Sequence, residues 1–283
     1  MAQDIELGSG VTAGRGRFAE RFRLPVAIAV FVLWLVITIN PLGGPSPGNF
    51  LSALASAPQW SILCAGLFLL LVAGVCRWGD LGLNPPEVSL RILWLPGLYL
   101  LLFILLDLLP FLPQVAREAN AQPLPASMVG ILLLNSALAG FSEELMFRGV
   151  LFGALRTRLP LLGAIVVTTV LFGLVHLLNA IAIGDWRLAA TQAVAAAMSG
   201  LLFIAIRLRT NSLLPGMIYH ALWDASLLVL VSAYASGGGA GGAGVALPAD
   251  TPPGLLAGPV ILLLPNFIYA LFLLRRRPVA AAA

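Results

Sequence analysis

Two adjacent carboxylates and an arginine interrupt an apolar stretch at residues 141–149, which reads Phe-Ser-Glu-Glu-Leu-Met-Phe-Arg-Gly. A charged side chain at membrane depth costs at least ~2.5–3.5 kcal/mol, so its presence in an apolar helix indicates a function. Residues four apart share a helical face, which pairs Glu144 with Arg148 and turns Glu143 away. We therefore expect a structural ion pair between Glu144 and Arg148, and a Glu143 that is free for chemistry.

The two histidines of the chain both fall inside predicted membrane helices. His176 follows Phe172 by four residues and His220 precedes Asp224 by four, so each pair shares a helical face. One such histidine is equally well explained as a hydrogen-bonded packing residue between helices. Two of them, together with an intramembrane acid pair, favour a functional site.

These groups have the chemistry that a hydrolytic site needs. A carboxylate or histidine takes a proton from water, a donor stabilises the oxyanion, and apolar surroundings strengthen both effects. Glu143 is the candidate base, assisted by His176. His220 and Asp224 are candidates for contacts with the substrate carbonyl or the oxyanion, and Asp224 can also orient the imidazole.

The composition predicts a polytopic membrane protein, whose helices would position these groups. Of the 283 residues, 60% are hydrophobic and 10% are charged, whereas soluble proteins are about a quarter charged. Apolar runs near the length of a membrane span recur. We predict an all-α bundle of about eight transmembrane helices at 24–39, 60–76, 92–112, 127–147, 161–181, 188–206, 213–231 and 255–274. We expect the third and seventh to be interrupted at Pro96, Pro110, Pro215 and Gly216.

The arginines predict the orientation of the bundle. With the N-terminus inside, only Arg117 and Arg187 of the sixteen basic residues fall on the outer side, as the positive-inside rule requires. Both termini are therefore expected in the cytoplasm. The arginines are scattered at the ends of apolar runs rather than gathered in one patch, which argues against nucleic-acid binding. The segment 24–39 lacks a following cleavage pattern, so we interpret it as an uncleaved anchor.

Three motifs occur in order on separate predicted helices. They are Glu-Glu-x-x-x-Arg at 143–148, Phe-x-x-x-His at 172–176 and His-x-x-x-Asp at 220–224. Together they resemble the CPBP family, the CAAX-processing and bacteriocin-processing intramembrane proteases also called Abi, over about residues 127–231. The resemblance implies an eight-helix bundle with a cavity open toward the cytoplasm. It also implies cleavage of a peptide bond near a membrane-anchored chain end.

The resemblance also implies roles for single residues. It assigns Glu143 as the catalytic glutamate and His176 and His220 as the catalytic histidines. The family often has Asn at the last motif position, where this chain has Asp224. An ionised acid can orient a histidine but cannot donate a hydrogen bond to an oxyanion. The supporting residues of the site are Glu144, Arg148 and Phe172.

The resemblance suggests four regions along the chain. A cytoplasmic tail occupies 1–23, N-terminal membrane helices 24–126 and the catalytic core 127–231. Residues 232–283 hold an outer Gly-rich loop, the last helix and the cytoplasmic C-terminus. Other intramembrane polar residues are weaker candidates: Asp107 for a function, Gln192, Thr168 and Thr169 for helix packing, and Asn135 and Asn179 for lining the cavity.

A metal site remains open at this point. Glu143, His176 and His220 are ligands that zinc accepts, but the chain lacks His-Glu-x-x-His, and the three would converge from separate helices. We favour activation of water by Glu143 and His176 without a cofactor, and keep zinc as the alternative.

The expected substrate is a membrane-tethered protein or peptide within the lipid bilayer. The lack of lysine and the abundance of Ala, Gly, Leu and Arg indicate a high-GC bacterium, hence an inner-membrane location where prenylated substrates are not expected. Two other functions stay open. Acids and histidines in a bundle also form the relays of proton- or ion-coupled transporters, although we find no internal repeat. A catalytically silent scaffold that binds a lipidated segment is the other alternative.

Overall fold

The computed structural model describes residues 22–39, 50–109, 112, 123–236 and 257–275. Within these residues it contains helices and no strand, which confirms the all-α prediction. Most of the predicted cytoplasmic tail, the Gly-rich outer loop at 237–256, Pro110, Arg117 and the C-terminus beyond Arg275 lie outside the described residues.

The helices follow one another along the chain with short connections. They are α2 (Arg23–Ile39), α3 (Phe50–Ser56), α4 (Trp60–Cys76), η1 (Leu90–Leu93), α5 (Trp94–Leu106), α7 (Ala126–Glu144), η3 (Leu145–Leu151), α8 (Phe152–Arg156), α9 (Leu161–Val175), η4 (His176–Leu178), α10 (Asn179–Ile183), α11 (Trp186–Thr210), α12 (Leu214–Ser236) and α14 (Gly258–Arg275).

Within the described part of the chain, five helical stretches are long and apolar enough to cross a membrane. They are Ala126–Arg156, Leu161–Ile183, Trp186–Thr210, Leu214–Ala233 and Gly258–Arg275. Shorter apolar helices, Arg23–Ile39, Trp60–Cys76 and Leu90–Leu106, lie at the other three predicted positions. The protein therefore has several membrane-spanning helices, and a total of about eight stays a prediction.

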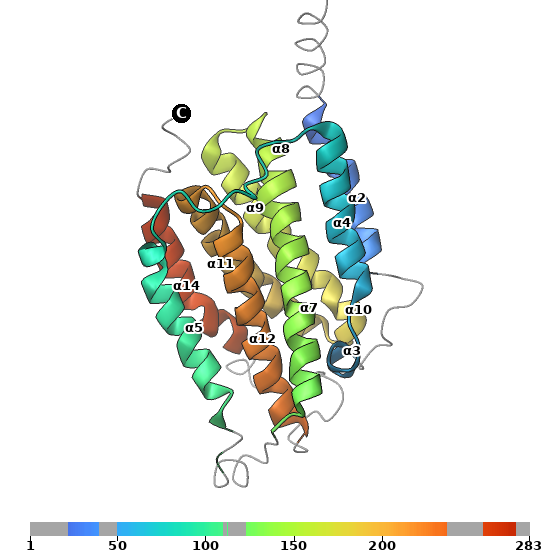
Figure 1. Ribbon diagram of the computed structural model, residues 1–283, viewed down its shortest axis with the longest axis vertical. Helices are drawn as coiled ribbons and strands as arrows, with labels where there is room; N and C mark the ends of the chain where they lie inside the picture. The colour runs from blue at the N-terminus through green and yellow to red at the C-terminus, as the bar shows by residue number, and fades with distance from the viewer. Residues whose placement is uncertain (1–21, 40–49, 110–111, 113–122, 237–256, 276–283) are drawn as a thin grey trace, which may run out of the picture.

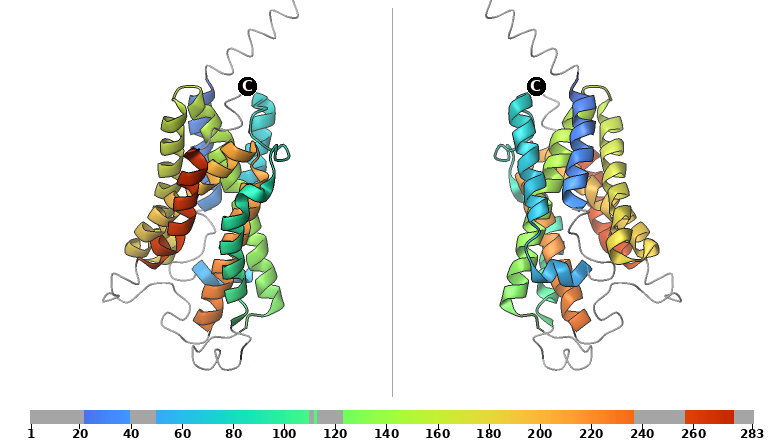
Figure 2. Two further views of the ribbon diagram at one scale, coloured as in Figure 1. Left: turned by 90° about the vertical axis from the view of Figure 1, so that its left-hand side faces the viewer. Right: turned by 90° about the vertical axis from the view of Figure 1, so that its right-hand side faces the viewer.

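Helix α11 lies beside α9 and α12, which carry two of the three motifs (Figure 1). Helix α11 packs against α9, α12 and α14, while α7 packs against α12 and α4. Successive long helices run in alternate directions, so the start of α2 and the end of α14 lie at the same end of the bundle. Helices α5 and α14 lie on one side of the bundle, which the left view of Figure 2 faces.

Two glycines allow the motif helices to approach closely. A Cβ at Gly140 of α7 would lie 2.8 Å from the backbone oxygen of Met217 on α12. A Cβ at Gly173 of α9 would lie 2.6 Å from the backbone oxygen of Ala193 on α11. Small residues at such contacts are typical of helix packing in membranes, where close van der Waals contact drives association.

The expected helix interruptions differ from the observed ones. Pro96 and Pro215 lie in the first turns of α5 and α12, where the missing N–H would have no partner within the helix. The prediction that they interrupt their helices is wrong, because α5 and α12 continue through these prolines. The proline that does lie inside a helix is Pro265 of α14.

The fourth predicted span also continues beyond its expected end. The sequence predicts an end at Phe147, whereas the helical stretch continues through η3 and α8 to Arg156. Arg148 does not mark the water boundary, since its side chain is covered inside the bundle. The third span is shorter than predicted, because α5 ends at Leu106 and Asp107 forms its C-cap.

Two of the weaker polar candidates, Asn135 and Asn179, have structural partners. Asn135 accepts from the backbone N of Gln59 at 2.8 Å and donates to the carbonyls of Leu54 and Ala57. It therefore ties the α3–α4 connection to α7. Asn179 donates to Gln192 at 3.3 Å, which links α10 to α11. The Thr168 and Thr169 hydroxyls have no hydrogen-bond partner among the described residues.

Candidate active site

A buried ion pair forms the inner part of the site. Arg148 Nη1 donates to Glu144 Oε1 at 2.9 Å, and both side chains are at most 1% exposed. The arginine Cζ lies 4.1 Å from the ring centroid of Phe172 and 5.1 Å from that of Phe203. The ion pair predicted from the spacing is confirmed, and aromatic faces cover the guanidinium.

The backbone around this pair is a π-helix rather than the expected α-helix. Residues Leu145–Leu151 form η3, and all seven of them are buried. Such segments are rare and are frequent at functional sites. On the opposite helix, Gly200 makes room for the pair, because a Cβ there would lie 2.9 Å from both Arg148 Nη2 and Phe172 Cδ1.

Glu144 has a second partner that the sequence did not indicate. Its Oε1 atom lies 3.0 Å from His220 Nδ1, a contact between α7 and α12 across 76 residues of sequence. His220 is nearly fully buried, and its ring stacks on Phe203 with centroids 4.7 Å apart and planes at 18°. Glu144 and Phe203 therefore fix the position of the imidazole. Phe203 belongs to none of the three motifs.

Glu143 lies at the outer edge of this cluster. Its side chain is 21% exposed, and its Oε2 atom lies 3.9 Å from His220 Nε2. This oxygen has no hydrogen-bond partner among the described residues. The carboxylate is also close enough to His176 and Asp224 to interact with them electrostatically. The two glutamates therefore differ as the helical spacing predicts.

Asp224 reaches the other nitrogen of His220. Its Oδ2 atom lies 3.3 Å from His220 Nε2, and its side chain is 36% exposed. Both ring nitrogens of His220 thus face carboxylate oxygens. Both contacts are hydrogen bonds only when both nitrogens carry hydrogen, as they do in the imidazolium.

His176 lies where its helix changes form. The sequence predicts one span over 161–181, but α9 ends at Val175 and a 3₁₀ turn begins at His176. His176 Nδ1 lies 2.8 Å from the carbonyl oxygen of Phe172, one turn earlier. A donor at Nδ1 fixes the tautomer and leaves the lone pair on Nε2. The motif spacing Phe-x-x-x-His therefore fixes the orientation of the His176 ring.

The choice between zinc and metal-free activation of water stays a prediction. No group of three or more His, Cys, Asp and Glu side chains within the described residues could hold a metal ion.

Comparison with known families agrees with the motifs. Residues 125–226 match the family model described as type II CAAX prenyl endopeptidase Rce1-like. These residues form an Rce1-like domain. The domain contains α7, α9 and α11 and the first half of α12, and with them every candidate site residue. Neither the curated proteins nor the solved structures contain a match to this chain.

The Rce1-like domain and the apolar helices identify an integral membrane protein. The domain also supports the general class of a CAAX-type intramembrane endopeptidase. The predicted family resemblance is thereby confirmed.

Proposed function

We propose that the protein hydrolyses a peptide bond of a membrane-associated protein or peptide by means of water activated by Glu143 and His176. The observation that carries the proposal is the contrast between adjacent glutamates. Glu144 is held by Arg148 and His220, whereas Glu143 Oε2 accepts no hydrogen bond from any described residue and lies beside His220. A carboxylate in that state is suited to bind and deprotonate water.

On this proposal Glu143 takes a proton from water while the water oxygen bonds to the scissile carbonyl carbon. His176 assists through the lone pair of Nε2. The resulting tetrahedral intermediate collapses when the C–N bond breaks, and Glu143 returns the proton to the leaving amine. The general base typically supplies about 10²–10⁴-fold of the rate in such a step.

His220 serves as the donor to the oxyanion. Glu144 and Asp224 hold the ring between two carboxylates, which favours the doubly protonated form. A substrate oxyanion then replaces Asp224 as the acceptor from Nε2, in apolar surroundings that strengthen the bond. Asp224 orients the imidazole and is not itself a donor, which accounts for an acid at this position.

No cofactor takes part in the proposed reaction. Elemental analysis of active purified protein tests this point. We expect cleavage to persist after dialysis against a strong chelator. Near-stoichiometric zinc that is lost together with activity, and restored together with it, would contradict the metal-free mechanism.

The class of substrate is tested with reconstituted protein and peptides tethered to the same vesicles. One peptide carries a prenylated C-terminal Cys, and the other is an unprenylated leader-like peptide with an apolar anchor. We expect cleavage of the second, in keeping with a bacterial source. Solute flux without cleavage would favour the transporter, and binding without either would favour the scaffold.

The orientation of the protein is part of the same proposal. Among the described residues, Arg77, Arg91, Arg156, Arg158, Arg207, Arg209 and Arg275 follow or precede helix ends at one end of the bundle. Arg187 lies at the other end, at the start of α11. We therefore propose the bacterial inner membrane, with both termini cytoplasmic. A C-terminal alkaline phosphatase fusion should be inactive, and an active one would reverse the topology.

A further inference from the structure

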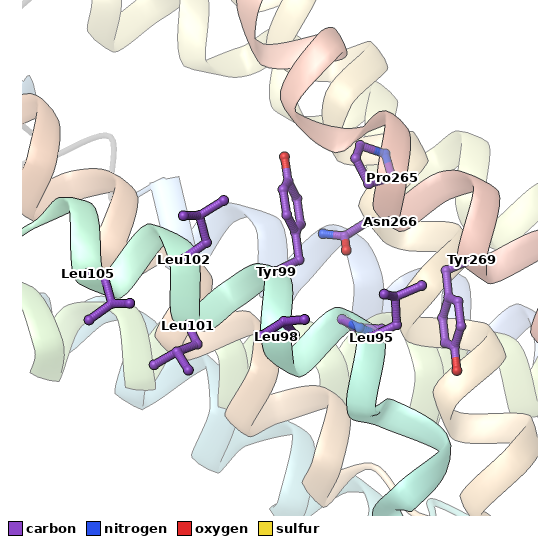
Figure 3. Close-up of a pocket in the computed structure, with 10 residues that line it drawn as sticks. Leu95, Leu98, Tyr99, Leu101, Leu102, Leu105, Pro265, Asn266 and Tyr269 are labelled. Atoms are coloured by element: carbon purple, nitrogen blue, oxygen red, sulfur yellow. The ribbon is translucent and has the colours of Figure 1, made fainter.

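A groove between α5 and α14 lies outside the candidate active site (Figure 3). It has a volume of about 420 Å³ and is lined mainly by leucines of α5 and by Pro265, Asn266 and Tyr269 of α14. A second hollow of about 400 Å³ continues it along α14 as far as Phe272. None of the described residues that line the two hollows is charged.

Asn266 places one unused donor at this groove. Asn266 is only 2% exposed. Its Oδ1 atom accepts a hydrogen bond from the Tyr219 hydroxyl at 3.1 Å. Its Nδ2 atom has no hydrogen-bond partner among the described residues. In Figure 3 this nitrogen points toward Tyr99 on the facing helix. An unpaired amide in such apolar surroundings is costly.

The other polar groups of the groove are already bonded or are acceptors. The Tyr99 hydroxyl donates to the carbonyl of Leu262 at 2.7 Å, and the Tyr269 hydroxyl donates to that of Ile92. Pro265 has no N–H to offer to the carbonyl of Ile261, four residues earlier. The groove thus combines an apolar surface with an amide donor and a helix carbonyl that lacks its usual donor.

The depth of Asn266 decides what can bind there. It lies eight residues from the start of α14 and nine from its end, which corresponds to roughly 12–14 Å in each direction. The hydrocarbon core of a bilayer is about 30 Å thick, so Asn266 lies near its middle. The ester groups of phospholipids lie at the headgroup boundary, about 15 Å away. A transmembrane polypeptide, in contrast, can carry a polar side chain at that depth.

We infer that this groove binds an apolar transmembrane helix with a serine or threonine hydroxyl near its middle. The hydroxyl accepts from Asn266 Nδ2, while leucines of the bound helix contact the apolar surface of the groove. If the proposed function holds, this helix is the membrane anchor of the substrate. In that case the groove binds the anchor of the substrate outside the candidate active site, while another part of the substrate reaches Glu143.

Binding is measured with the full-length Glu143→Gln protein in phosphatidylcholine nanodiscs, so that the outcome does not depend on turnover. The probes are two fluorescent Leu/Ala helices that differ at one central position, Ser in one and Ala in the other. We expect the Ser helix to bind about threefold more tightly, the size of an average interhelical hydrogen bond. Asn266→Leu should make the two helices bind equally.

Two matched variants test the location. Leu102 lines the groove and Leu271 lies on α14 outside it, with similar exposures of 50% and 42%. Leu102→Trp should fill the groove and weaken the binding of both probe helices by about tenfold or more. Leu271→Trp should leave the binding of both unchanged. Equal binding of the two helices by the parent protein, or a Ser preference that survives Asn266→Leu, would overturn the inference. A bound lipid as the occupant predicts the first of these results. If the parent protein cleaves neither tethered peptide while the Ser preference is intact, the proposed function alone is contradicted.

Discussion

The inner and outer halves of the site use the same residue type in opposite ways. In the inner half, Glu144 is 1% exposed and is bonded to both Arg148 and His220. In the outer half, Glu143 is 21% exposed and has no hydrogen-bond partner for Oε2 among the described residues. The adjacent glutamates thus differ in both burial and hydrogen bonding.

On the proposed function, this difference keeps one carboxylate of the site available for reaction. Isolated buried charges are costly, so the inner acid is stable there only with its partners. The same ion pair fixes the ring of His220 and anchors the helix turn that carries Glu143. The outer acid is partly exposed as a side chain, but its Oε2 atom is covered and has no partner among the described residues.

The largest effect is expected from Glu143→Gln. The substitution keeps the volume of the side chain but removes the base, so turnover should fall by about 10²–10⁴-fold. The melting temperature in detergent should stay within error of the parent, since this oxygen has no described partner. Cleavage of a tethered peptide and thermal unfolding measure the two quantities. Normal turnover in this variant would remove Glu143 from the mechanism.

Glu144→Gln should have the opposite profile. It leaves the buried Arg148 without its carboxylate, and breaking a buried pair typically costs about 3–5 kcal/mol. We expect a lower melting temperature and lower abundance in the membrane. The double variant Glu144→Gln/Arg148→Met serves as the control and should recover most of the stability. If Glu144→Gln melts like the parent while Glu143→Gln does not, the assignment of the two halves is reversed.

Gly200→Ala tests the packing of the inner half. The added methyl would lie 2.9 Å from Arg148 Nη2 and from Phe172, so we expect a loss of about 1–3 kcal/mol from overpacking. Gly130→Ala on α7 is the matched control, because nothing lies within 4 Å of its Cβ position. Chemical unfolding in mixed micelles compares them. Equal stabilities would show that the inner half is not tightly packed.

Asp224→Asn should have the smallest effect, because this residue is the most exposed of the cluster. The amide can still bond to His220 but no longer supplies a charge. We expect kcat to fall by about tenfold, with unchanged unfolding. Asp224→Ala, which removes the hydrogen bond as well, should be slower than Asp224→Asn. A larger loss in the Asn variant would give the carboxylate itself a chemical role.

Features that depend on neighbours along the chain could be predicted from the sequence. The apolar runs indicate a helical membrane protein, and the spacing of four residues indicates the pair of Glu144 with Arg148. The same spacing correctly separates Glu143 from that pair. These predictions hold because a helix fixes the relative directions of residues within one or two turns.

Contacts between helices were decided by the tertiary structure. The contact of Glu144 with His220, the stacking of Phe203 on that ring and the hydrogen bond from Tyr219 to Asn266 all join distant segments. Nothing in the local spacing sets how two helices rotate and tilt against each other. That geometry follows from close contacts at small residues such as Gly140 and Gly173, summed over the whole bundle. The sequence by itself therefore determined the chemical groups and their faces, and only packing decided which faces meet.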